Sequence, residues 1–397
     1  MNEAIIYYRN KIFSNFYRYI LKPVFFMMDP EYIHDKITSL GALLGDYRVG
    51  KKITEGFFGY ENKILEQKIL GMDFKNPIGL SAGFDKNAQL TDILSSVGFG
   101  FAEVGSITGN FCEGNPKPRL WRLKESRGLL VYYGLKNDGC EAIADRLNKK
   151  LADISSKRLN RIGEYKEEIS RKNGIFFPIG INIAMTNCKD NFIINNAVKD
   201  FAKSFRVMEP FGSYMTINIS CPNTEGGQPF IIPQNLVYLL DTIDKIPTTK
   251  PIFIKLSPDL SLMELDRLLD IVLFHRIHGI ICTNLTKKRD NSRIVDNHVP
   301  AVGGMSGKIV QDLSDKMMSH IYKRVGGKLI LIGSGGVFSA EDAYKKIRLG
   351  ASLVQMITGM IFEGPQVVSE INQGLVQLLK KDGFTNISQV VGVDCPI

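Results

Sequence analysis

Short apolar runs alternate with longer amphipathic stretches over most of the chain. The runs that read as strands cover residues 78–82, 101–105, 178–182, 214–220, 252–256, 279–283, 329–333 and 353–356. Amphipathic stretches of helical length lie between most of them, for example residues 196–207, 262–275 and 339–348. Eight strands alternating with helices favour a parallel (β/α)8 TIM barrel over an open sheet, which usually has about five or six strands.

The first 60 residues follow a different pattern. Aromatic and aliphatic side chains recur at helical spacing over residues 4–28, and basic residues lie between them, namely Arg9, Lys11, Arg18 and Lys22. A second amphipathic stretch covers residues 30–44 and ends at Gly45. Either these helices pack on the main core, or they lie in a membrane interface with apolar side chains in lipid and cations at the headgroups.

These patterns divide the chain into two parts. Residues 1–60 are predicted to form an N-terminal helical extension, and residues 61–397 are predicted to form a barrel. The first element of the barrel region is a hairpin around residues 70–74. Two connections within the barrel are unusually long, residues 107–177 and 286–328. Long loops at the active-site end of a barrel are commonly lids or substrate walls.

Composition narrows the class of protein. Hydrophobic residues make up 44% and charged residues 23%, which excludes a disordered chain. The net charge of +9 is spread over the whole length without an arginine-rich tract, so we expect no nucleic-acid partner. The six cysteines form no CxxC pair and no Cys/His ligand spacing, so we expect free thiols and no metal site. The apolar run near the N-terminus is interrupted by Lys22, Pro23 and Asp29, well short of the about 20 residues that span a bilayer.

Polar residues follow several of the predicted strands. Barrels of this kind carry their active sites at the C-terminal ends of the strands, so these residues are the candidates for chemistry. They are four amides and two ammonium groups, those of Asn182, Asn218, Asn223, Asn284, Lys86 and Lys255. Amide side chains both donate and accept hydrogen bonds, which suits a planar heterocycle lined with alternating C=O and N–H groups.

A glycine turn follows the seventh predicted strand. Gly335 and Gly336 precede a helix that starts near Ser339, so backbone N–H groups are available there for a phosphate. This is the usual phosphate position in such barrels. Together with residues 350–355 (GASLVQ), the turn indicates the phosphate site of a flavin mononucleotide, FMN.

Several motifs resemble those of the dihydroorotate dehydrogenases. They are residues 82–86 (AGFDK), 115–123 (NPKPRLWRL), 218–224 (NISCPNT), 303–307 (GGMSG) and 350–355 (GASLVQ). The likeness extends from about residue 19 to residue 384. The extension, with residues 28–31 (MDPE), is similar to that of the class 2 enzymes, which are peripheral membrane proteins that pass electrons to quinone.

The resemblance implies an FMN cofactor and a set of residues that hold it. These are Ala82, Gly83, Ser106, Asn182, Asn218, Lys255, Thr283, Gly307, Gly336 and Thr358. Lys255, if it lies beside the flavin, would stabilise negative charge on the reduced ring.

The resemblance also implies how substrate is bound and activated. Substrate contacts come from Lys86, Tyr133, Gly134, Leu135, Asn218, Asn223 and Asn284, and Cys221 stands in the general-base position. Lys86 would pair with a carboxylate or carbonyl of the substrate. A thiol reaches its basic form more readily than a serine hydroxyl.

The implied reaction is the oxidation of (S)-dihydroorotate to orotate in pyrimidine biosynthesis, with a quinone as electron acceptor. The implied location is the cytoplasmic face of a bacterial inner membrane or the mitochondrial inner membrane. None of the strand-end candidates lies in the extension. We therefore expect the extension to serve the membrane and the quinone, and the barrel alone to bind substrate.

Three positions depart from the pattern of the class 2 enzymes. Cys221 stands where those enzymes carry serine, and cysteine is typical of the soluble class 1 enzymes. Val131 replaces an asparagine that bonds the pyrimidine, and Leu285 replaces a small polar residue. Either Tyr132 or Tyr133 compensates, or the substrate is another cyclic amide or enone. A non-catalytic membrane-bound paralogue is the third alternative.

Overall fold

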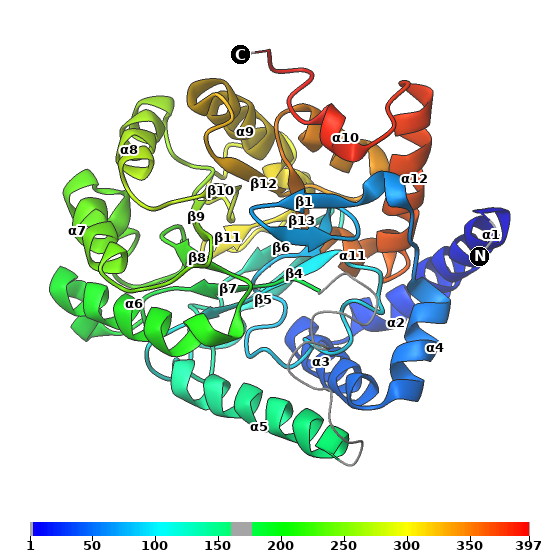
Figure 1. The fold of residues 1–397 in the computed structure, drawn as a ribbon, viewed down its shortest axis with the longest axis horizontal. Coiled ribbons are helices and arrows are strands. Elements are labelled where there is room, and N and C mark those ends of the chain that lie inside the picture. The colour runs from blue at the N-terminus through cyan, green and yellow to red at the C-terminus, as the bar shows by residue number, and fades with distance from the viewer. Residues whose placement is uncertain (1–2, 160–176, 397) are drawn as a thin grey trace.

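Eight parallel strands close into a barrel in the order β10-β12-β13-β3-β4-β7-β8-β9 (Figure 1). The computed structural model describes residues 3–159 and 177–396. The barrel strands are β3 (Ile78–Leu80), β4 (Phe101–Ile107), β7 (Ile179–Ile183), β8 (Tyr214–Asn218), β9 (Ile252–Leu256), β10 (Gly279–Cys282), β12 (Ile330–Ser334) and β13 (Leu353–Met356). The predicted (β/α)8 barrel is confirmed, and each predicted strand is present.

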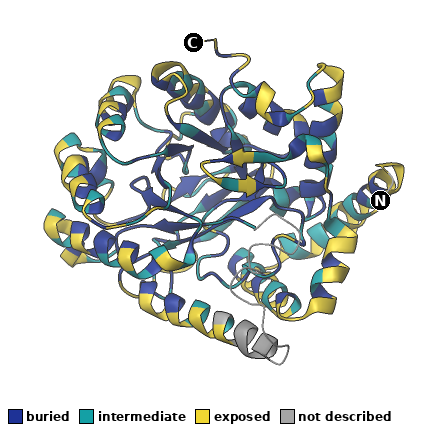
Figure 2. Cartoon of the chain, in the orientation of Figure 1, coloured by how far each residue is buried: buried dark blue, intermediate teal, exposed yellow. Residues whose placement is uncertain are grey.

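Amphipathic helices surround the barrel and turn their apolar sides inward (Figure 2). They are α6 (Ile194–Met208), α7 (Pro233–Asp244), α8 (Leu262–Phe274), α9 (Gln311–Val325), α10 (Ala340–Arg348), α11 (Thr358–Glu363) and α12 (Val367–Lys381). The strands are buried on both faces, because one face meets these helices and the other fills the barrel. Ser339 caps α10 as its sequence predicts, since its hydroxyl accepts a hydrogen bond from the Asp342 N–H.

A hairpin closes the N-terminal end of the barrel. Strands β1 (Gln67–Ile69) and β2 (Met72–Phe74) pair antiparallel, which confirms the predicted hairpin. Ile69 and Phe74 pack with residues at the starts of the barrel strands, among them Phe101 and Tyr214. Because this end is filled by side chains, the opposite end is the one that can hold ligands.

A three-stranded antiparallel sheet lies over that opposite end. It consists of β5 (Leu120–Leu123), β6 (Gly128–Val131) and β11 (Gly304–Met305), in the order β11-β6-β5. The two long connections supply its strands, so they form a wall over the barrel mouth. The first connection also contains α5 (Cys140–Leu159), and its residues 160–176 lie outside the described part of the chain.

The extension contains more helix than its sequence pattern predicts. The two predicted helical stretches are present as α1 (Glu3–Phe16), a π-helical turn (Tyr17–Leu21) and α2 (Lys22–Met27), and as α3 (Pro30–Asp46). A further helix, α4 (Arg48–Phe58), was not predicted. Its sequence carries two glycines, which weaken the intrinsic helical tendency, and its packing against α3 compensates. The Tyr17 hydroxyl donates to the Ile361 carbonyl at 2.6 Å and helps to hold the extension on the barrel.

Candidate active site

One cavity lies at the C-terminal ends of the barrel strands, beneath the sheet β11-β6-β5. Its wall includes the predicted residues Ala82, Gly83, Lys86, Ser106, Tyr133, Gly134, Leu135, Asn218, Cys221, Asn223, Lys255, Thr283, Asn284, Gly307, Gly336 and Thr358. The structure thus brings together residues from all parts of the barrel sequence. Asn182 is the predicted residue that does not reach this wall.

Asn182 lies behind the wall and supports it. Its side chain is fully buried, its amide N–H donates to Glu103 Oε1 at 2.7 Å, and its oxygen accepts a short hydrogen bond from the Ser106 hydroxyl. Glu103 also accepts from the Gln355 amide at 3.0 Å. Because both ends of the Asn182 amide are occupied, this side chain orients Ser106 in the structure described.

The other amides are joined to Ser106 by further hydrogen bonds. Asn218 Nδ2 donates to Ser106 Oγ at 2.8 Å, and Asn218 Oδ1 accepts from the Ser220 hydroxyl at 2.8 Å. Asn284 Nδ2 donates to the same Ser220 hydroxyl at 3.0 Å. A chain of polar side chains therefore connects the ends of β4, β8 and β10 and fixes the orientation of the amides toward the cavity.

Lys255 is a buried cation without a paired anion. It lies on β9, and its Nζ is 3.4 Å from the Ser81 hydroxyl. No carboxylate within the described ranges comes within 4.0 Å of it. Burial lowers the pKa of Lys255, and the charge of Glu103 opposes that shift. An unpaired ammonium at a cavity wall is suited to a group that carries or develops negative charge.

The glycine turn after β12 offers backbone donors. Gly335 and Gly336 have φ values of +107° and +78°, and a Cβ at Gly336 would lie 2.4 Å from the Gln311 Cβ, so only glycine fits there. In the described residues, the N–H groups of Gly335, Gly336 and Val337 meet no acceptor. Free N–H groups that line a cavity at a glycine turn are typical of a phosphate site.

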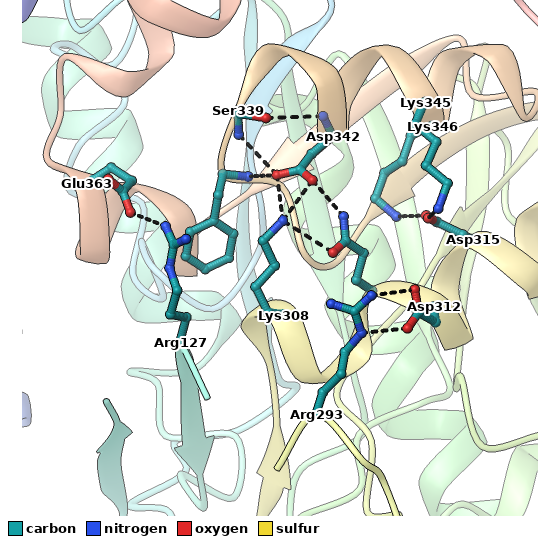
Figure 3. Close-up of polar contacts among 12 residues, drawn as sticks. Arg127, Arg293, Lys308, Asp312, Asp315, Ser339, Asp342, Lys345, Lys346 and Glu363 are labelled. Carbon is teal, nitrogen blue, oxygen red and sulfur yellow. Dashed lines mark hydrogen bonds and ion pairs between the residues drawn. The ribbon is translucent and has the colours of Figure 1, made fainter. Parts of the chain in front are cut away.

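A network of charged side chains binds the segment that directly follows this turn (Figure 3). Lys308 Nζ lies 2.7 Å from both carboxylate oxygens of Asp342, and one of those oxygens accepts from the Phe338 and Ser339 N–H groups. Burial opposes ionisation of Asp342, but Lys308 outweighs it, and the pKa of Asp342 is lowered. The paired charges fasten the turn to the start of α10.

Cys221 lines the cavity beside Pro222 and Asn223. Burial raises the pKa of its thiol to about 11, although the Asn223 N–H and Lys287 act in the opposite direction. The sequence alone indicated only that a thiol reaches its basic form more readily than a serine hydroxyl. In the structure, loss of hydration around the partly buried thiol disfavours its charged form and shifts it further toward the protonated form than in an unperturbed cysteine.

Lys86 and Tyr133 lie against each other in the wall of the same cavity. Lys86 Nζ lies 4.1 Å from the centre of the Tyr133 ring. The Tyr133 hydroxyl is buried, and it has no hydrogen-bond partner in the part of the chain that the structure describes. Burial lowers the pKa of Lys86 to about 8 against the opposing charge of Asp35. The ammonium group of Lys86 is therefore available to an anionic ligand, whereas the Tyr133 hydroxyl is enclosed by protein.

The substitutions at Val131 and Leu285 change which polar groups are available. The backbone carbonyl of Val131 accepts from Asn223 Nδ2 at 2.9 Å, and Asn223 Oδ1 is buried without a partner in the described ranges. The Leu285 N–H donates to Asn284 Oδ1 at 2.8 Å. Tyr132 does not belong to the cavity wall, whereas Tyr133 does. Tyr133 and Asn223 both line the cavity, although the Tyr133 hydroxyl and Asn223 Oδ1 are themselves enclosed by protein.

The sequence pattern missed several wall residues, of which His34 is the most informative. His34 lies on α3 of the extension, and its Nε2 is 3.2 Å from Lys86 Nζ. The expectation that the extension stays separate from the substrate residues was therefore wrong. A signal was present in the sequence, since His34 lies three residues after Glu31 of the MDPE motif and so on the same face of the helix. Ser81, Ser306 and Gln355 also line the cavity.

Clusters suited to a metal ion do not occur in the described ranges, where no three His, Cys, Asp or Glu side chains come together. All six cysteines are free. The polar groups of the cavity wall are ammonium groups, amides, hydroxyls, a thiol and backbone N–H groups.

Comparison with known proteins agrees with this arrangement. The family model for dihydroorotate dehydrogenase matches residues 64–379. The dihydroorotate dehydrogenase (quinone) of Trichodesmium erythraeum is 32% identical over 96% of this chain and 99% of its own length. That of Sulfurovum sp. is 36% identical over 94% of this chain and 97% of its own.

A solved structure shares the fold over nearly the whole chain. The crystal structure of DHODH from Eimeria tenella in complex with ferulenol has a TM-score of 0.76 and 29% identity, and the match covers 92% of this chain and 96% of that one. The barrel, the strand-end amides, the glycine turn and the matched sequence together lead to one conclusion: the chain belongs to the dihydroorotate dehydrogenase family.

Proposed function

We propose that this protein oxidises (S)-dihydroorotate to orotate with bound FMN, and passes the electrons to a quinone. The observation that carries the proposal is a single cavity that contains a glycine turn with free N–H groups, two ammonium groups without paired anions, and a thiol. Relatives that align over nearly the whole chain are named dihydroorotate dehydrogenase (quinone).

The residues present fit FMN. The N–H groups of Gly335, Gly336 and Val337 would hold the phosphate, and a side chain at Gly336 would close that space. Lys255 and the amide of Asn218 would meet the ring system. When bound, FMN supplies a ring that accepts a hydride from the substrate and later releases the electrons. Lys255 favours this chemistry because its charge stabilises negative charge nearby in a site shielded from water.

The substrate is held and deprotonated by residues of the barrel. Lys86 pairs with its carboxylate, and the strand-end amides that line the cavity, those of Asn218, Asn223 and Asn284, meet its ring amides. Cys221 takes the proton from the substrate carbon next to a carbonyl, as the thiolate form of its side chain. The sheet β11-β6-β5 covers the site and excludes bulk water from it.

An apolar part of the cavity points to the quinone. Leu120, Leu129, Val131 and Ile361 line it, and they pack in one cluster with Phe26 of α2. The cavity wall is therefore continuous with the extension. A hydrophobic electron acceptor reaching the cavity from the extension meets apolar side chains along this part of the wall.

We extend the proposal to peripheral membrane association through the extension. Large apolar side chains are exposed on it, including Ile12, Tyr19, Met27, Leu43 and Ile53. Basic residues lie among them, which matches an interfacial helix. No helix in the described part of the chain has the length and apolar character needed to cross a bilayer.

Vesicle binding tests the membrane proposal. A triple variant, Ile12→Asn, Met27→Asn and Ile53→Asn, should lower the affinity for anionic phosphatidylglycerol vesicles by at least about tenfold, because each exposed apolar side chain contributes on insertion. Phe274→Asn is the matched control, since Phe274 is 89% exposed on α8, far from the extension (Figure 1). Equal sedimentation of wild type and the triple variant would contradict the proposal.

The visible spectrum of the purified protein tests the function directly. We expect flavin absorption that bleaches when dihydroorotate is added without oxygen and returns when a quinone is added. Bleaching by a different cyclic amide or enone, and not by dihydroorotate, would assign the other substrate raised by Val131 and Leu285. Flavin that no such compound bleaches would identify a non-catalytic paralogue.

A further inference from the structure

We infer that His34 of the extension is a positioning residue for Lys86, so that the extension helps to build the substrate site as well as the membrane surface. The inference rests on the proposed function, because it takes Lys86 as the cation that meets the substrate carboxylate. It assigns to α3 a part in substrate binding in addition to any part in quinone access.

The geometry places His34 directly against the loop that carries Lys86. His34 Nε2 lies 3.2 Å from Lys86 Nζ. The His34 ring also packs edge-on against Phe84, two residues before Lys86, with ring centres 4.9 Å apart and planes at 84°. Both His34 and Lys86 line the cavity. One side chain of the extension therefore contacts the loop at two points and limits where the flexible Lys86 can go.

The contact is a hydrogen bond from lysine to histidine. Burial, together with the charge of Lys86, lowers the pKa of His34 to about 3, so the imidazole is neutral at physiological pH. An ammonium group can only donate, so His34 Nε2 is the acceptor and its proton resides on Nδ1. A neutral acceptor orients the ammonium group without cancelling its charge.

Two other lysines of this protein, the partly buried Lys308 and the fully buried Lys346, show the contrast. Lys308 and Lys346 lie 2.7 Å from carboxylate oxygens of Asp342 and Asp315, which satisfy their charges (Figure 3). For Lys86, no carboxylate in the described ranges lies within 4.0 Å. The charge of Lys86 therefore remains available to an anionic ligand, and His34 only directs it.

The helix that carries His34 is itself held firmly. Glu31, one turn earlier, is buried and accepts three hydrogen bonds from Arg119, at 2.8, 3.0 and 3.2 Å, and one from Lys136 at 3.2 Å. These interactions outweigh burial and lower the pKa of Glu31 to about 2. Since Arg119 directly precedes β5, α3 is fastened to the sheet over the cavity. The interactions of Glu31 therefore fix the position of α3, and with it the position of His34 next to Lys86.

Half-reactions without quinone test this role. In the His34→Ala variant, the Lys86 side chain can adopt other rotamers and water can enter the vacated space. Binding of substrate then has to order the ammonium group, at a cost in conformational entropy. We expect roughly tenfold weaker binding of orotate by calorimetry and of dihydroorotate in anaerobic stopped-flow reduction, which corresponds to about 1.4 kcal/mol. The limiting rate of reduction should stay close to that of wild type. His34→Gln, which keeps a neutral acceptor, should restore most of the affinity.

The controls separate this inference from the proposed function. Lys36→Ala, an exposed change on the same helix, should behave as wild type, and melting temperatures show whether each variant is folded. If wild-type protein neither binds orotate nor is reduced by dihydroorotate, the proposed function fails and the inference with it. If wild type does both and His34→Ala binds equally well, or if only reoxidation by quinone slows, the inference alone is overturned. Failure of the glutamine variant to recover affinity would equally count against a role through Lys86.

Discussion

Replacing Cys221 with alanine should slow flavin reduction by dihydroorotate by roughly 10²–10⁴-fold, the usual contribution of a positioned base. The flavin should stay bound, because the thiol is not among the groups that hold it. Stopped-flow reduction under anaerobic conditions measures the rate, and Cys188→Ala, which changes another free thiol, is the matched control. A rate like that of wild type in the Cys221 variant would leave the thiol as a space-filling group beside Pro222.

The pH dependence of reduction follows from the burial of Cys221. Burial raises the pKa of the thiol to about 11, so the basic form is scarce at neutral pH and increases as the pH rises toward that value. The wild-type rate should therefore keep rising through the alkaline range, beyond the ordinary thiol pKa of about 8.5. Cys221→Ser should retain some activity and need a still higher pH. A plateau near the ordinary thiol pKa would show that another group limits proton removal.

Replacing Lys255 with methionine should reduce the rate of flavin reduction by roughly 10²–10³-fold and weaken FMN binding, because a preorganised charge is lost where negative charge develops. Methionine fills a similar volume, so packing is preserved. Flavin content after gel filtration and the anaerobic reduction rate are the measurements. Wild-type values for both would show that Lys255 does not face the flavin.

Stability provides the control for the Lys255 variant. Burial lowers the pKa of this lysine, which means that the folded protein disfavours its charge. Removing an unpaired buried charge should therefore leave the melting temperature of flavin-free protein unchanged or raise it. Loss of the paired Lys346 should have the opposite effect, because Asp315 would be left without one of its partners. A drop in melting temperature for both would indicate a structural role for Lys255.

The sequence by itself determined the barrel and predicted a set of strand-end residues of which all but Asn182 line the cavity. Strand and helix periods are local properties, since each strand is a short, predominantly apolar run and each helix has one apolar side. The ends of parallel strands meet at one end of a barrel, so Lys86, Asn218, Cys221 and Lys255 could be placed at one mouth before any contact was known. Gly336 was identifiable because its turn precedes a capped helix.

Only the tertiary structure decided which of these groups are free and which are occupied. The contact between His34 and Lys86 joins residues 52 positions apart, and Asn182 proved to be engaged by Glu103 and Ser106 behind the wall. The three strands over the cavity are short, and β11 joins the β5-β6 hairpin from a distant segment, so no local pattern marks them as one sheet. The pKa of Cys221 depends on how far packing removes water from the thiol. The spacing of apolar residues shows which face of a single helix or strand is buried. Hydrogen bonds between side chains of different elements, and the loss of water around a titratable group, depend on how the elements pack, so they can be seen only in the folded chain.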